Sequence, residues 1–206
     1  GDGIQALTTL RVSGGDIRIT SGGGSTVGST QSGWGSWNTG SANDDTDKSA
    51  KGLKADNGIE ISGGSIEIDS SDDSIHSNNT IVISGGVMKL SSGDDGIHSD
   101  AALTISAGTI DIAKSYEGLE SLSITISGGD IRLVASDDGI NAAGGNDGSS
   151  MNGRPGQNGF RSGGSGLIDI RGGNIVVNAS GDGVDANGSI KMSAGTLIIN
   201  GPTDNG

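Results

Sequence analysis

The chain has 206 residues, of which 41 are glycine and none is cysteine, and it carries a formal net charge of −13. The missing cysteine excludes a disulfide framework and thiolate metal sites. The acidic balance argues against nucleic acid and anionic membranes as partners, and because no apolar run has membrane-spanning length, we expect no membrane insertion.

One short motif recurs along the whole chain: in most copies it is an acidic residue, then glycine, then an aliphatic residue. The middle copies are 22, 22 and 21 residues apart, counted from Ser74 to Gly96, Gly118 and Gly139. Repetition at a fixed period predicts a stack of similar units, each contacting its neighbours. The seven copies start at Asp2, Lys51, Asp73, Asp95, Glu117, Asp138 and Asp182.

Each motif is followed by two aliphatic pairs that flank a turn of small residues. In the first repeat, Leu10 and Val12 precede Gly14, and Ile17 and Ile19 follow it. Alternating β-branched residues are typical of strands with one buried face. The sequence therefore predicts an all-β fold, a right-handed parallel β-helix (solenoid) of about seven coils with three short strands per coil.

We expect a single β-helix domain over 1–206 with two loop insertions, at about 21–49 and 143–166. Both segments are rich in Gly, Ser and Asn and break the repeat period. The first contains Trp34 and Trp37. Exposed indoles suit stacking on sugar rings, although the pair would serve equally as a plug that pins the loop to the coils.

Carboxylates form columns on either side of the motif glycine. Neighbouring coils lie about 4.8 Å apart, where two such charges repel by ~3.5 kcal/mol at an effective dielectric near 20. Oxygen donors of this kind suit Ca²⁺, although a single Asp-Asp-Gly copy is also ordinary turn chemistry, with Asp capping its own backbone and Gly supplying a positive φ. The predicted calcium ligands are Asp72, Asp73, Asp94, Asp95, Glu117, Glu120, Asp137, Asp138, Asn141, Asp182 and Asp185.

The motif glycine is expected to point outward and leave a bare floor beside the acidic strip, where an extended polymer could lie; the alternative is that glycine serves only the turn. Lys51 and Lys54 replace acidic residues, either as counter-charges for Asp2 and Asp73 or as a general base. Without a third nitrogen or thiolate ligand, we expect no zinc at the two histidines. The predicted carbohydrate-binding residues are Trp34, Trp37, Lys51, Lys54, His76 and His98.

The repeated Gly-[Ile/Leu/Val]-x-[Ala/Ser] segment, followed by Ile-x-Ile-Ser-Gly-Gly-x-Ile-x-Ile, and the closing segments 181–188 and 193–203 resemble a bacterial family of carbohydrate-binding β-helix proteins. That family is similar in fold to polysaccharide lyases and is associated with cellulose, polygalacturonate and calcium. Lys51, Lys54 and Ser74 depart from its pattern. The resemblance implies calcium at Asp73, Asp95, Glu117, Asp138 and Asp182.

From these features we expect a non-catalytic, calcium-stabilised protein that is extracellular or attached to the cell surface. Its expected partner is a plant cell-wall polysaccharide, cellulose or polygalacturonate or both. Two alternatives stay open. One is a calcium-dependent pectate lyase with Lys54 as the base. The other is a structural surface fibre built by end-to-end self-association of coils.

Overall fold

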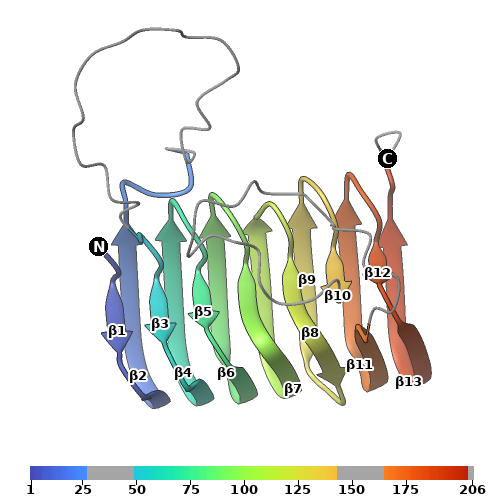
Figure 1. Ribbon diagram of the computed structural model, residues 1–206, viewed down its shortest axis with the longest axis horizontal. Helices are drawn as coiled ribbons and strands as arrows, with labels where there is room; N and C mark the ends of the chain where they lie inside the picture. The colour runs from blue at the N-terminus through green and yellow to red at the C-terminus, as the bar shows by residue number, and fades with distance from the viewer. Residues whose placement is uncertain (27–48, 143–164, 204–206) are drawn as a thin grey trace, which may run out of the picture.

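The structure is a computed structural model, and it describes residues 1–26, 49–142 and 165–203. Within these ranges the chain forms thirteen strands and no helix, and each strand pairing is parallel (Figure 1). No segment of the described chain is therefore a helix that could span a bilayer. The predicted all-β class with parallel strands is confirmed.

Most repeats consist of a three-residue strand and a longer strand that bends at the small-residue turn. The three-residue strands are β1 (Ile4–Ala6), β3 (Leu53–Ala55), β5 (Ile75–Ser77), β10 (Ile140–Ala142) and β12 (Val184–Ala186). The longer strands are β2 (Thr9–Ser21), β4 (Gly58–Ser70), β6 (Thr80–Ser92), β11 (Leu167–Ala179) and β13 (Ser189–Asn200). In the middle repeats the divisions differ, with β7 (Ile97–Lys114), β8 (Leu119–Ile126) and β9 (Asp130–Ala135).

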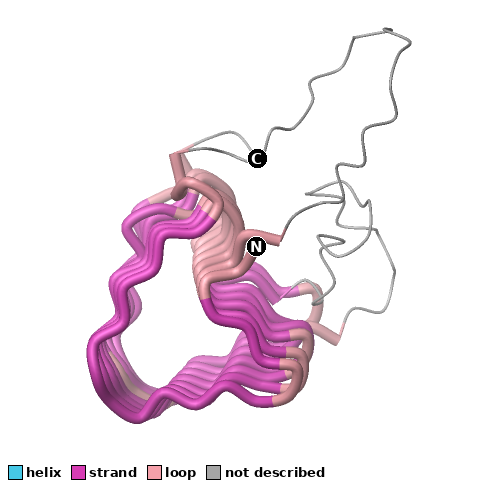
Figure 2. The backbone as a smooth tube through the Cα atoms, turned by 90° about the vertical axis from the view of Figure 1, so that its left-hand side faces the viewer, coloured by secondary structure: helices cyan, strands magenta, loops and turns pink. Residues whose placement is uncertain are grey.

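Each strand pairs with the equivalent strand of the next repeat, so successive turns of the chain lie behind one another when viewed along the stack (Figure 2). The insertions do not disturb this order. Ile4 pairs with Leu53 across the first insertion, and Ile140 pairs with Val184 across the second. Parallel pairing in register therefore aligns chemically equivalent residues along the stack.

The predicted aliphatic columns form the core of the stack. One column consists of Ile59, Ile81, Leu103, Ile124 and Ile168, each at most 1% exposed. Burial of such side chains stabilises the fold by about 1.5–3 kcal/mol each. Because the described chain contributes little aromatic volume, the core depends on repeated aliphatic contacts between neighbouring repeats.

The motif glycines face the core, so the predicted bare floor for a polymer is wrong. A Cβ on Gly52 would lie 2.4 Å from Cγ2 of Ile68 and 2.5 Å from the carbonyl oxygen of Ser74. A Cβ on Gly96 would lie 2.6 Å from the carbonyl oxygen of Gly118. Glycine is required here because the chain packs tightly against both the isoleucine column and the next repeat.

Positive φ angles occur at a different glycine of the repeat, in the small-residue turn. Gly64 and Gly86 both have φ of +93°, whereas none of the motif glycines lies in the positive region. The alternative in which the motif glycine supplies a positive φ to an Asp-Asp-Gly turn is thus wrong as well. The left-handed conformation belongs to the turn between the two aliphatic pairs.

Substitution of Gly96 by alanine should destabilise the protein by about 1–3 kcal/mol, because the added methyl group overlaps rigid backbone and packed Ile112. The control is Gly14→Ala, where nothing lies within 4 Å of the added atom. Urea unfolding of both variants measures the difference. Equal stabilities for the two variants would contradict the close-packing account.

Candidate functional site

A buried polar corner runs along the stack beside the motif glycine. Two positions of each repeat contribute to it. One residue directly precedes the motif glycine, and the other lies two places after that glycine, in the strand that begins there. We expected an extended polymer to lie beside these side chains, but Asp73 and His98 are 0% exposed, and Lys51 and Asp95 are 3% exposed. Around these four residues the corner is therefore an internal polar seam, whereas Asp182 in the last repeat is exposed.

Motif aspartates connect each repeat to the next through the backbone. Oδ1 of Asp73 accepts a hydrogen bond from the N–H of Asp95 at 3.1 Å, and Oδ1 of Asp95 accepts one from the N–H of Glu117 at 3.0 Å. The same contact joins Asp138 to the N–H of Asp182 at 2.7 Å. These motif aspartates therefore accept hydrogen bonds from the backbone of the following repeat rather than from their own turn.

Towards the N-terminus the corner is neutralised by a lysine. We call Lys51, Asp72, Asp73 and His76 the lysine half. Nζ of Lys51 lies 2.8 Å from Oδ1 of Asp72 and 2.8 Å from Oδ2 of Asp73. The alternative in which Lys51 acts as a counter-charge for Asp73 is confirmed, and Asp72 is its second partner.

Charge pairing in the lysine half overcomes the cost of burial. Burial alone would raise the pKa of Asp73, but the Lys51 ammonium and the hydrogen bond with His76 lower this pKa well below its usual range. Burial would likewise lower the pKa of Lys51, and the charges of Asp73 and Asp72 instead raise it above its ordinary value. Both groups are therefore charged at neutral pH.

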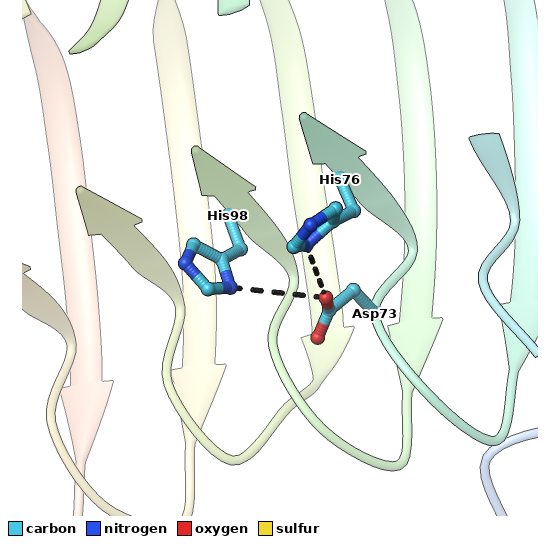
Figure 3. A group of neighbouring side chains, drawn as sticks. All are labelled: Asp73, His76 and His98. Carbon is cyan, nitrogen blue, oxygen red and sulfur yellow. Dashed lines mark hydrogen bonds and ion pairs between the residues drawn. The ribbon is translucent and has the colours of Figure 1, made fainter. Parts of the chain in front are cut away.

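The two histidines approach Asp73 from neighbouring strands, β5 and β7 (Figure 3). Nδ1 of His76 lies 2.8 Å from Oδ2 of Asp73, whereas Nδ1 of His98 lies 3.8 Å from the same oxygen. Their ring centroids are 4.8 Å apart with an edge-on orientation. His76 is thus hydrogen-bonded to Asp73, while His98 lies between this carboxylate and those of the next repeats.

The following repeats carry the buried carboxylates Asp95 and Glu117, and within the described residues the charges that shift their pKa values most are those of other carboxylates. We call Asp95, His98, Glu117, Glu120 and Asn141 the carboxylate half. Burial, with the charges of Asp94 and Glu120, raises the pKa of Asp95 well above its usual range. Burial and the charge of Glu120 raise the pKa of Glu117 to about 9. These shifts mean that the folded chain disfavours the ionised form of both groups.

Two buried oxygens of the carboxylate half have no hydrogen-bond partner within the described residues. They are Oε2 of Glu117 and Oδ1 of Asn141. The other ends of the two side chains meet, since Nδ2 of Asn141 donates to Oε1 of Glu117 at 2.8 Å. Buried polar atoms are almost always satisfied, so a cation or an ordered water would complete this part of the corner.

Near the C-terminal end of the stack, the predicted oxygen ligands are more accessible. Asp138 lies beside Asp137, Asp182 and Asp185, and burial together with the charges of Asp137 and Asp185 raises the pKa of Asp138 to about 6. Asp182 is exposed. This group offers only oxygen donors, which is the donor set that Ca²⁺ prefers.

The predicted sugar-binding residues are dispersed. Lys51, His76 and His98 are at most 3% exposed, so a polysaccharide cannot reach them in the described structure. Lys54 is partly exposed, with Nζ 3.9 Å from Oδ2 of Asp2, as the counter-charge alternative predicted. Trp34 and Trp37 lie outside the described residues. Sequence analysis missed Asp100, whose Oδ1 lies 3.5 Å from Nε2 of His98.

Residues 1–96 match the model of a family described as carbohydrate-binding domain-containing protein. The matched part runs from the first repeat through the lysine half and ends just after Asp95. It covers less than half of the chain and shows a similarity to that family. No curated protein and no solved structure matches the chain.

Replacement of Lys51 by methionine should destabilise the protein by about 3–5 kcal/mol at pH 7, because it leaves a buried carboxylate without its partner. Chemical denaturation measures the loss. The control is Arg11→Met. Arg11 forms an exposed ion pair in which its Nε lies 3.0 Å from Oε2 of Glu60, so its loss should change the free energy of unfolding by less than about 1 kcal/mol. A loss below 1 kcal/mol for Lys51→Met would show that the buried pair is not needed.

The metal-free protein should lose stability as the pH rises from about 4.5 to about 9, the window between the ordinary and the folded pKa of Glu117. A carboxyl group with a raised folded pKa binds more protons when folded, so deprotonation favours the unfolded chain. Asp95 and Asp138 shift in the same direction. Melting temperatures measured in chelator across this window provide the check.

Glu117→Gln should flatten this pH profile, because the variant has no proton to lose at that position. Glu67→Gln, at an exposed carboxylate paired with Arg18, is the matched control and should leave the profile unchanged. If Glu117→Gln has the same pH profile as the unmodified protein, the loss of stability does not come from deprotonation of Glu117.

Proposed function

We propose that this protein is a non-catalytic carbohydrate-binding protein built as a right-handed parallel β-helix. The observation that carries the function is the match of residues 1–96 to the carbohydrate-binding domain-containing family. Two observations support the β-helix. Each strand pairs in parallel with the equivalent strand of the next repeat, and successive turns of the chain lie behind one another in Figure 2. An acidic, cysteine-free repeat protein of this kind suits an extracellular or cell-surface location.

The proposed ligand is a plant cell-wall polysaccharide, cellulose or polygalacturonate. The first insertion lies within the matched residues and carries both tryptophans of the chain. Indole rings stack on the apolar faces of sugars, which suits an uncharged polymer such as cellulose. Polygalacturonate is an anion, so its recognition by a chain with a net charge of −13 requires a bridging cation.

Calcium is the proposed bridging and stabilising ion, and the acidic groups of the C-terminal repeats fit it. Asp137, Asp138, Asp182 and Asp185 supply oxygen donors, and the exposure of Asp182 leaves room for a uronate carboxylate. The lysine half does not fit calcium, since Nζ of Lys51 already lies between Asp72 and Asp73. When bound, the ion would supply positive charge and vacant coordination positions.

The binding role is favoured over the lyase alternative by the surroundings of Lys54. Its Nζ lies 3.4 Å from Oγ of Ser49 and 3.9 Å from Oδ2 of Asp2. A lysine that acts as a base in proton abstraction must have its nitrogen available to the substrate, whereas the Nζ of Lys54 already contacts Ser49 and Asp2. The same contact supports a structural role for Lys54 as a counter-charge.

Intrinsic fluorescence offers a direct test, because Trp34 and Trp37 are the two tryptophans of the chain. Calcium-loaded protein is titrated with polygalacturonate and with cello-oligosaccharides, with and without EDTA. The unmodified protein should not bind polygalacturonate in EDTA. The Asp182→Asn variant should not bind it even when calcium is present. Cello-oligosaccharide binding should persist in EDTA and be lost in Trp34→Ala.

The controls separate binding from catalysis and from folding. Formation of unsaturated product, seen as near-ultraviolet absorbance that grows with time, would support the lyase alternative. Asp16→Asn changes one carboxylate on β2, outside the polar corner, and should bind like the unmodified protein. If the protein binds neither polygalacturonate nor cello-oligosaccharides, the proposed function is wrong.

A further inference from the structure

Three groups of potential metal ligands lie along the polar corner within the described chain. They are Asp72, Asp73 and Asp94; Asp73, His76 and His98; and Asp95, His98 and Glu120, each with ligand atoms within 4.8 Å of one another. The first two groups share Asp73. Since Lys51 and His76 are both 2.8 Å from Oδ2 of Asp73, an internal cation and an imidazole already occupy this carboxylate.

The third group has a different geometry. Nδ1 of His98 lies 3.7 Å from Oδ2 of Asp95 and 3.6 Å from Oε2 of Glu120. These distances exceed normal hydrogen bonds. Ligand atoms about 2.1 Å from a tetrahedral metal ion are roughly 3.4 Å from one another. The two distances from Nδ1 of His98 are therefore close to those around a small divalent ion, and all three atoms lie within 4.8 Å of one another.

A second carboxylate lies behind the imidazole. Oδ1 of Asp100 is 3.5 Å from Nε2 of His98, whereas Asp95 and Glu120 are near the other ring nitrogen, Nδ1. A histidine that binds a metal through one nitrogen usually donates its other N–H to a carboxylate, which fixes the tautomer and the ring orientation. Asp100 is placed for that function, with Nδ1 as the ligand atom.

An unsatisfied oxygen lies next to the group. Asn141 pairs with Glu120 in the register of β8 and β10, so the two side chains occupy the same face of adjacent strands. Asn141 is 2% exposed, and its Oδ1 has no hydrogen-bond partner within the described residues. A buried amide oxygen without a donor is an available ligand for an ion or for a metal-bound water.

We propose that Asp95, Glu120 and Nδ1 of His98 bind a transition metal of the zinc class, with Asp100 positioning the imidazole and Asn141 completing the site. A mixed nitrogen and oxygen donor set suits Zn²⁺ or Co²⁺, whereas Ca²⁺ takes oxygen ligands. The sequence analysis expected no zinc because it considered only a third nitrogen or a thiolate, whereas this group combines one imidazole with two carboxylates. The site would join three consecutive repeats through β7, β8 and β10.

The test uses the unmodified protein, because the chain contains only two histidines. Metal-free protein with ¹⁵N-labelled histidine is titrated with Zn²⁺, and long-range ¹H–¹⁵N spectra follow both imidazoles. We expect Nδ1 of one ring to shift as a metal-bound nitrogen, while Ca²⁺ leaves both rings unchanged. Zn²⁺ saturation without a metal-bound imidazole nitrogen would overturn the proposal, as would an absence of Zn²⁺ binding.

Variants assign the ligand. Calorimetric Zn²⁺ titration should show no high-affinity binding to His98→Asn, full affinity in His76→Asn, and a 10–100-fold loss in Asp100→Asn, the usual effect of removing the partner of a metal-bound histidine. Co²⁺ should give visible absorption bands in the unmodified protein and in His76→Asn. Equal losses in the two histidine variants would contradict the proposal. If His98→Asn does not fold, the imidazole spectra of the unmodified protein decide.

Discussion

Parallel pairing in register places equivalent side chains of successive repeats about 4.8 Å from one another. For the aliphatic columns this is favourable, because each isoleucine packs on the next and excludes water. For a charged column the same spacing is unfavourable, because like charges accumulate along the stack. The polar corner must therefore contain a compensating charge in every repeat where a buried carboxylate is ionised, and its two halves achieve this differently.

In the lysine half the compensation is internal, since the ammonium of Lys51 contacts Asp72 and Asp73 and lowers the pKa of Asp73. In the carboxylate half the described chain supplies no such ammonium, and the pKa values of Asp95 and Glu117 rise instead. Protonation or a bound cation can relieve this repulsion. An ion at the proposed site would also stabilise the protein, because it would bind the folded state alone. The similarity to a carbohydrate-binding family ends at residue 96, so the carboxylate half lies almost wholly beyond it.

Sequence periodicity predicted the strands, the parallel stacking and the aliphatic core, because a repeated column has the same partner above and below it. It failed at Gly52 and Gly96, since these glycines lie in a bend, where the two-residue alternation of a strand does not apply. It also placed His76 and His98 among residues that a polysaccharide could reach, although each histidine lies in a run of three consecutive buried residues, in β5 and at the start of β7. Pairing of Lys51 with Asp73 was predictable from opposite charges in one column. The approach of His98 to Glu120 was not predictable. The two residues belong to different repeats, and the spacing of residues in the sequence does not say in which direction each side chain points.

The most direct measurement is a crystal structure of the chelated protein reloaded with Zn²⁺, with anomalous diffraction recorded on both sides of the zinc absorption edge. We expect an anomalous peak between Asp95, His98 and Glu120, and none beside Lys51, where Asp72 and Asp73 already hold an ammonium. A peak between Asp72 and Asp73, or a carboxylate half that binds no ion while keeping its geometry, would contradict this expectation.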